Sequence, residues 1–277
     1  DVDNLEVDVL NKLREVFTKT VNNGYSSNFI KHQSLDAVRF AEIMLGVNKD
    51  NGKYEVEKYD ITVANPPYTD SGNYGNELKN YVNDKYKKPT SFHKNLYACF
   101  LKKNSDFIND QGKIAMIHPL TFMYITSYKE MRKFILDNYH IDTLIEFGLG
   151  GVFEDTSINV DTAGYILENN NYNQKTYFMN LQEYKGHSNK SNIFLSAYKD
   201  YINNKENKHN YTLDQGKLRI IDGYPFIYWI SDSFREKFEE KQLGDILDVK
   251  SGVATANNLR FLRFWWEIDK DKISSNY

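Results

Sequence analysis

Hydrophobic and polar positions follow two rhythms along the chain. Apolar residues at helical spacing predict helices, and short apolar runs ended by proline or glycine predict strands. The helical pattern covers residues 8–17, 37–45, 76–86, 95–107, 127–139 and 231–241. The strand pattern covers residues 55–64, 113–118, 141–147, 161–167 and 225–229. Strands that alternate with helices in this way are typical of a doubly wound α/β sheet.

Periodicity is lost in residues 168–222, where Asn, Lys and Tyr are abundant. We interpret this segment as a connector with short strands or helices of its own, and the polar run 203–210 within it as exposed. The chain begins at Asp1 without a methionine and ends shortly after a strongly aromatic segment. We therefore expect a fragment of a longer protein.

The most informative motif directly follows the strand pattern of residues 55–64. Its sequence is Asn65-Pro66-Pro67-Tyr68. Two prolines can neither continue a strand ladder nor occupy a helix interior, so they fix an amide and an aromatic ring at the end of the strand. In open α/β sheets, ligands bind at the carboxyl ends of the strands. A simple turn is the alternative interpretation, because these residue types are also common at strand ends.

The motif resembles the one that marks methyltransferases of planar amino groups, above all adenine N6 in DNA, and the chemistry explains why these residue types are needed. The nitrogen of such an amine is a poor nucleophile, because its lone pair is delocalised into the ring. The side-chain carbonyl of Asn65 and the backbone carbonyl of Pro66 can accept from the amine and direct its lone pair at a methyl group. Pro66 and Pro67 would keep these acceptors preorganised. Tyr68 offers a face for a base that has been flipped out of a duplex.

A glycine-rich turn lies at residues 148–151, after the predicted strand 141–147. A cofactor-binding turn of this kind needs a helix directly after it, but here the sequence leads into another strand. We interpret the glycines as a loop that shapes the wall of a pocket, with Phe153 as the second aromatic face. His118 ends a strand before a proline, and we interpret it as a hydrogen-bonded boundary residue rather than a substrate contact.

Composition narrows the class of protein. The net charge is −3, so any DNA binding must rely on local positive patches. We interpret the lysine clusters at residues 85–88 and 102–103 as solvent-exposed surface rather than as such patches. The single Cys99 rules out an internal disulfide and is consistent with a reducing cytoplasm. The sequence predicts no signal peptide and no membrane partner. His93, His118 and His140 lie on different elements, so no metal site is expected.

The block from Asn65 to Leu167 resembles the catalytic domain of bacterial DNA adenine-N6 methyltransferases, including the type IIG restriction–modification enzymes. The resemblance is greater to the PglX methyltransferases of BREX phage-defence systems. Residues 117–124 (IHPLTFMY) and 127–132 (SYKEMR) are similar to that family's strand, loop and helix after the catalytic motif. Residues 252–255 (GVAT) and 258–267 (NLRFLRFWWE) are similar to the start of its target-recognition region.

This resemblance implies a partial Rossmann-like, class I S-adenosylmethionine-dependent methyltransferase sheet, followed by the start of a target-recognition domain. Residues 1–180 would be the C-terminal part of the catalytic domain, 181–224 the connector, and 225–277 the beginning of the recognition domain. The implied co-substrate is S-adenosylmethionine, without a metal. The implied partners are double-stranded DNA and other subunits of a defence system, in the cytoplasm.

The family also implies roles for individual residues. Asn65 and Pro66 would accept from the target amine, and Tyr68 would stack on the flipped adenine. Phe153 would complete the base pocket. Ser34 and Leu35, together with Asn65, would line the cofactor.

The sequence departs from the family in one respect. The family's glycine-rich cofactor loop lies upstream of the catalytic motif, and this chain has no such loop there. We therefore expect the isolated chain neither to bind S-adenosylmethionine tightly nor to methylate DNA. Two alternatives remain open: a methyltransferase acting on a glutamine side chain or on RNA, and a non-catalytic DNA-binding component of a defence complex.

Overall fold

The computed structural model describes the part of the chain that carries the motif. The described residues are 15, 58–88, 91–150, 152, 160–169, 175–184, 187–248, 256–269 and 271. The helix predicted at 37–45 lies outside them. Of the helix predicted at 8–17, only Glu15 is described, and it is helical.

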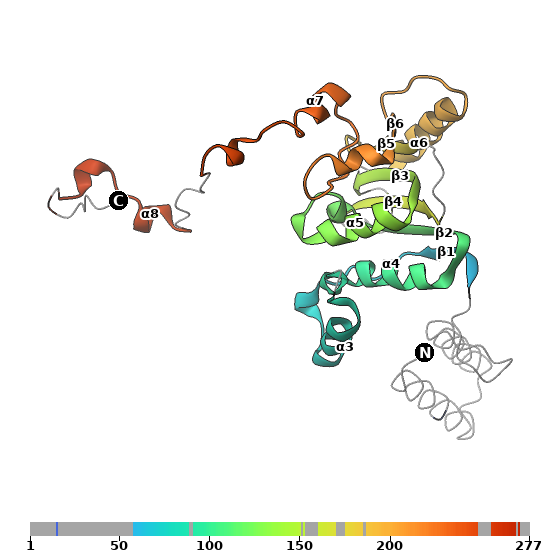
Figure 1. Ribbon diagram of the computed structural model, residues 1–277, viewed down its shortest axis with the longest axis horizontal. Coiled ribbons are helices and arrows are strands. Elements are labelled where there is room, and N and C mark those ends of the chain that lie inside the picture. Colours follow the sequence, from blue (N-terminus) through green and yellow to red (C-terminus); the bar gives the residue numbers. More distant parts are fainter. Residues whose placement is uncertain are drawn as a thin grey trace.

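The described residues form a six-stranded mixed sheet (Figure 1). The strands are β1 (Tyr59–Ala64), β2 (Ile108–Pro119), β3 (His140–Leu149), β4 (Asp161–Glu168), β5 (Thr176–Asn180) and β6 (Asn210–Leu213). Their order is β1-β2-β4-β3-β5-β6. The pairs β1–β2 and β3–β5 are parallel, and the other three pairs are antiparallel. The predicted α/β fold class is confirmed.

Helices cover both faces of this sheet. The described helices are α3 (Asn76–Tyr86), α4 (Leu96–Phe107), α5 (Lys129–Asn138), α6 (His187–Ile202), and the short α7 (Asp232–Glu236) and α8 (Asn258–Phe261). Of these, α4 and α5 lie on one face of the sheet and α6 on the other. The main core joins α4 and α5 to β2, β3 and β4, and it includes Phe178 of β5. The neighbouring residues Tyr177 and Met179 point to the opposite face, where they pack with Ala197 of α6. The layers are therefore α4 and α5, the sheet, and α6 (Figure 1).

Local signals located most of these elements. The helix predicted at residues 76–86 has the bounds of α3, and the one predicted at 95–107 is α4 with Asn95 as its N-cap. The helix predicted at 127–139 is α5, preceded by a 3-10 turn. The apolar sides of α4 and α5 pack against the sheet, whereas Val82 of α3 packs with Tyr74 and Cys99.

Two predicted elements are wrong. Residues 225–229 form no strand, although Phe226 and Tyr228 are buried, because the Phe226 amide donates to the carbonyl of Met123 in a 3-10 turn rather than to a strand. The helix predicted at residues 231–241 ends at Glu236. Phe234 and Phe238 are exposed, so this helix lacks the packing that would extend it.

The segment interpreted as a connector supplies α6 and β6, and β6 extends the sheet by pairing with β5. Of the polar run predicted to be exposed at residues 203–210, residues 203–206 and 208 are exposed, Asn207 and Asn210 are half-buried, and His209 is buried. The boundaries of the three predicted domains stay predictions. Within the described part of the chain, the helices found are too short or too polar to cross a membrane.

Candidate functional site

The motif Asn65-Pro66-Pro67-Tyr68 lies at the carboxyl end of β1, beside the carboxyl end of the parallel strand β2. The register pairs Ala64 with Met116, which places Asn65 level with Ile117. Pro66 is buried, whereas Asn65 and Pro67 are exposed and Tyr68 is half-buried. The prolines end the strand because neither can donate to a ladder. The amide of Asn65 is thus presented to solvent from a loop that two prolines stiffen.

Tyr68 is tied to both neighbouring strand ends. Its hydroxyl donates to the side-chain oxygen Oδ1 of Asn65 at 2.6 Å and lies 3.3 Å from the carbonyl oxygen of Ile117. Burial raises the pKa of the Tyr68 phenol above its usual value. The hydroxyl therefore keeps its proton at neutral pH and remains a hydrogen-bond donor.

The chain beyond the motif is fixed against the start of α4. The Leu96 amide donates to the Thr69 carbonyl at 3.1 Å, and the Asn95 side chain donates to Oδ1 of Asp70 at 2.6 Å. Oδ1 of Asn95 also accepts from the Tyr97 amide and so caps α4. The motif is consequently held on one side by β1 and on the other by α4.

His118 is completely buried behind the motif, at the end of β2. Its ring stacks on Tyr97, with centroids 4.2 Å apart and planes 7° apart. Nδ1 lies 3.0 Å from the Pro119 carbonyl, which can only accept, so Nδ1 carries the proton. Nε2 then accepts from the Tyr165 hydroxyl at 2.8 Å. These contacts agree with the interpretation of His118 as a hydrogen-bonded boundary residue.

The burial of His118 predicts a stability that depends on pH. Burial lowers the pKa of the folded imidazole from 6.5 to about 3. Between these values only the unfolded state binds the proton, so the free energy of unfolding is expected to fall as the pH decreases below about 6.5. The slope should reach at most about 1.4 kcal/mol per pH unit. Urea unfolding at pH 7 and at pH 5 measures this loss.

The control for this prediction is His118→Phe, which keeps an aromatic ring over Tyr97 and cannot titrate. Its stability is expected to change less between pH 7 and pH 5 than that of the wild type. An equal change in the two proteins would show that other groups cause the acid sensitivity.

Glu146 lies at the carboxyl end of β3, in the same row across the sheet as His118, because both pair with Ala163. It is completely buried. The Tyr124 hydroxyl donates to its Oε2 at 2.8 Å, and the side chain of Gln182 donates to the same oxygen. Burial raises the pKa of the Glu146 carboxyl, while these two donors act in the opposite direction. The carboxyl thus links β3 to the segments that carry Tyr124 and Gln182, at the same edge of the sheet as the motif.

The glycine-rich turn begins two residues after Glu146. Gly148 and Gly150 have φ angles of 70° and 67°, which side chains other than that of glycine rarely adopt. The buried amine of Lys190 in α6 donates to the carbonyls of Leu149 and Gly150, at 3.0 and 2.6 Å. Phe153, predicted to face the base, lies outside the described residues.

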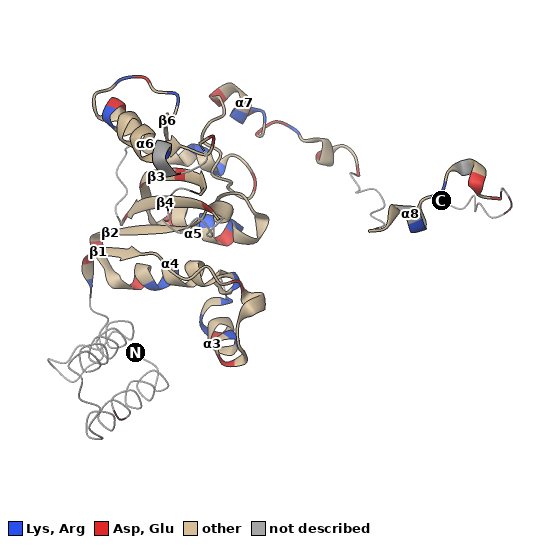
Figure 2. Cartoon of the chain, turned by 180° about the vertical axis from the view of Figure 1, so that it is seen from behind, with Lys and Arg blue, Asp and Glu red and all other residues tan. Residues whose placement is uncertain are grey.

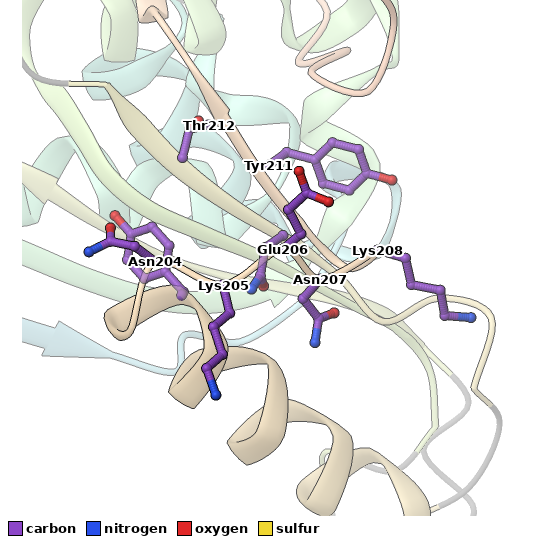
Figure 3. Close-up of a pocket in the computed structure, with 9 residues that line it drawn as sticks. Asn204, Lys205, Glu206, Asn207, Lys208, Tyr211 and Thr212 are labelled. Atoms are coloured by element: carbon purple, nitrogen blue, oxygen red, sulfur yellow. The ribbon is translucent and has the colours of Figure 1, made fainter.

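One hollow on the described residues lies far from the motif. It measures about 670 Å³ and lies along β6 and the end of α6 (Figure 3). Its lining consists of Tyr201, Asn204, Lys205, Glu206, Asn207, Lys208, Asn210, Tyr211 and Thr212. Because β6 and β1 are the two opposite edges of the described sheet, this hollow does not belong to the site at Asn65.

Charge does not mark a DNA-binding face on the described residues. Lys and Arg are interspersed with Asp and Glu over α3, α4 and the loop between α6 and β6 (Figure 2). In the same part of the chain, no group of three or more His, Cys, Asp and Glu side chains is placed to hold a metal ion.

The structure brings four of the predicted site residues together and leaves three untested. Asn65, Pro66, Pro67 and Tyr68 lie together in the loop that follows β1, whereas Ser34, Leu35 and Phe153 lie outside the described residues. Sequence reasoning missed the pairing of Asn95 with Asp70. The helix predicted to begin at residue 95 was a signal for a capping Asn95, but nothing local points to its partner 25 residues away.

Comparisons with known proteins agree with the family resemblance. The chain is similar to the adenine-specific methyltransferase PglX of Lacticaseibacillus casei (strain Zhang), with 27% identity over 230 residues, which are 80% of this chain and 18% of that protein. It is also similar to the adenine-specific methyltransferase BrxX of Escherichia coli O9:H4 (strain HS), with 26% identity over 214 residues, 76% of this chain and 17% of that protein. The chain thus spans less than a fifth of the length of either relative.

Among solved structures, the chain is similar to a methyltransferase subunit of a type I restriction–modification system from Streptococcus thermophilus. The identity is 19% and the TM-score is 0.47, over 69% of this chain and 45% of that chain. The family model described as Eco57I restriction-modification methylase matches residues 5–153, which include the whole of the Asn65 motif. Since this match covers more than half of the sequence, the chain belongs to the Eco57I restriction-modification methylase family.

Proposed function

We propose that this chain is the amine-methylating part of a site-specific DNA adenine-N6 methyltransferase in a phage-defence or restriction–modification system. The observation that carries the proposal is the presentation of the Asn65 amide at the carboxyl end of β1, beside Tyr68. Membership of a methylase family supports it, as do two relatives named adenine-specific methyltransferases.

Asn65, Pro66 and Tyr68 would each make a different contact with the target adenine. Oδ1 of Asn65 has a second lone pair besides the one that receives the Tyr68 proton, and it would accept one N–H of the amine. The carbonyl of Pro66 would accept the other N–H. Two acceptors in a fixed turn would draw the nitrogen toward tetrahedral geometry and aim its lone pair. The ring of Tyr68 would stack on the flipped base.

S-adenosylmethionine is the proposed co-substrate and would supply an electrophilic methyl group. The amine nitrogen would form the new N–C bond as the C–S bond breaks, the sulfur would leave as a neutral thioether, and the nitrogen would then release one proton to solvent. The described residues fit the amine side of this reaction. The glycines before the motif, Gly24, Gly46 and Gly52, are isolated from one another, so no glycine-rich turn for the adenosine can be assigned. The cofactor would be lined by Ser34 and Leu35, and the base pocket would be completed by Phe153.

The test is to identify the methylated product. The intact protein is incubated with S-adenosylmethionine carrying a labelled methyl group and with duplex DNA, RNA or a protein acceptor in separate reactions. Digestion and mass spectrometry are expected to find the label in N6-methyldeoxyadenosine. Label in RNA or in a glutamine side chain would replace the proposed substrate. DNA binding without any methyl transfer would support a non-catalytic component instead.

A further inference from the structure

The hydrogen bond between Tyr68 and Asn65 raises a question of orientation. The two ends of an Asn amide have nearly the same shape, but only the oxygen accepts hydrogen bonds. Asn65 is exposed, so solvent would permit either orientation. An amide turned the other way would present a donor to the amino group of the substrate. Catalysis on an amine therefore requires something that selects the oxygen.

The position of the Tyr68 hydroxyl favours one of the two orientations of the Asn65 amide. Its hydroxyl carries one proton and faces two acceptors, Oδ1 of Asn65 at 2.6 Å and the Ile117 carbonyl at 3.3 Å. Hydrogen bonds between hydroxyl groups and oxygen are most often 2.7–2.8 Å long, so the shorter contact is the strong one. If the Asn65 amide were reversed, its NH2 group would donate to the hydroxyl. The phenol proton would then have only the long contact to Ile117.

The support behind Tyr68 is rigid. The carbonyl of Ile117 belongs to β2, whose next residue, His118, is stacked on Tyr97 and hydrogen-bonded to Tyr165. The pKa of the Tyr68 phenol is raised by burial, so the donor persists at neutral pH. The hydroxyl is thus a fixed donor aimed at one end of the Asn65 side chain.

We propose that the Tyr68 hydroxyl sets the orientation of the Asn65 amide, so that Oδ1 rather than the NH2 group meets the target amine. Tyr68 then has two separable parts: a ring that stacks on the base and a hydroxyl that positions the acceptor. This inference rests on the proposed function, and it adds a positioning role to a residue that the proposed function uses only for stacking.

A double-mutant cycle in the intact protein tests the proposal. Tyr68→Phe keeps the ring and is expected to lower the single-turnover rate of methyl transfer about 10-fold, the cost of one good hydrogen bond. The KM for DNA and the fluorescence of 2-aminopurine at the target position should change little, because stacking is retained. In an Asn65→Asp background both side-chain oxygens accept, so Tyr68→Phe should there cost less than about threefold.

The matched control is Tyr81→Phe on α3, an exposed tyrosine away from the motif, which should leave the rate unchanged. A second measurement covers the case of an inactive Asn65→Asp variant. A fluorinated tyrosine that ionises near neutral pH is placed at position 68. The methyl-transfer rate of this variant should fall as the pH rises through the ionisation of the fluorotyrosine, because a phenolate cannot donate a hydrogen bond. The rate of Tyr68→Phe should show no such fall.

Three results would overturn the inference. The first is an unchanged methyl-transfer rate in Tyr68→Phe, and the second is an equal loss of rate from Tyr68→Phe in the wild-type and Asn65→Asp backgrounds. The third is a methyl-transfer rate of the fluorotyrosine protein that does not change as the phenol ionises. Its failure can be told apart from failure of the proposed function. If the wild type transfers no methyl group to DNA, the proposed function fails. If the wild type methylates adenine but any of these three results is found, only the role of the hydroxyl fails.

Discussion

Asn65→Ala is expected to lower the single-turnover rate of adenine methylation by about 10²–10³-fold. The substitution removes the side-chain acceptor and leaves the Pro66 carbonyl as the remaining acceptor of the turn. The amine nitrogen would stay conjugated with its ring and present no lone pair to the methyl group. DNA affinity should change little, because Asn65 is proposed to act on the amine rather than on the duplex. Rapid-quench transfer of a labelled methyl group measures the rate.

The matched control for this prediction is Asn80→Ala, which removes the same side chain from the exposed surface of α3. It should retain the wild-type rate. If Asn65→Ala were as active as Asn80→Ala, the motif would be a structural turn and the proposed function would lose its main support.

Arg132→Met is expected to lower the free energy of unfolding by about 3–5 kcal/mol. Arg132 lies in α5 and is 1% exposed. Its guanidinium makes four hydrogen bonds to three backbone carbonyls, those of Phe122, Ile125 and Gly223. Burial lowers its pKa to about 10, so it remains charged at neutral pH. A methionine fills much of the space but leaves the three carbonyls without this donor.

Urea unfolding of the intact protein measures this loss, and hydrogen exchange of peptides from residues 120–125 and 222–226 locates it. The control is Lys133→Met in the same helix. Lys133 pairs with Asp137 at the surface at 2.6 Å, and losing it should cost no more than about 1 kcal/mol. A comparable loss in the two variants would mean that the carbonyl contacts of Arg132 add little to stability.

The parts of the fold that were predictable are those specified by neighbouring residues. Amphipathic spacing located α3 and α4, and the two prolines located the end of β1. The joining of β6 to β5 was not predictable, because it depends on partners more than 30 residues apart. The strand wrongly predicted at residues 225–229 also reflects a contact with a residue that is distant in sequence. Buried alternating aromatics predict a strand, but the Phe226 amide finds its partner in the loop after β2.

The candidate site shows the same division. Asn65, Pro66, Pro67 and Tyr68 are adjacent in sequence, so their chemistry could be inferred together. The hydrogen bond from Tyr68 to Asn65 and the pairing of Asp70 with Asn95 depend on side-chain conformation and on tertiary packing. Periodicity carries no information about either. The orientation of the acceptor is therefore a property of the folded chain.

The position of β4 has a consequence for the order in which the protein assembles on the ribosome. β3 pairs with β4 and β5, and both follow it in sequence. One edge of β2 likewise pairs with β4, which is synthesised later. At roughly 5–20 residues per second, synthesis of the ~50 residues between the ends of β2 and β4 takes about 2.5–10 s. β2 has an open edge throughout that interval, and β3 joins it for the last ~20 residues of synthesis, so this is the period in which chaperone binding would matter most.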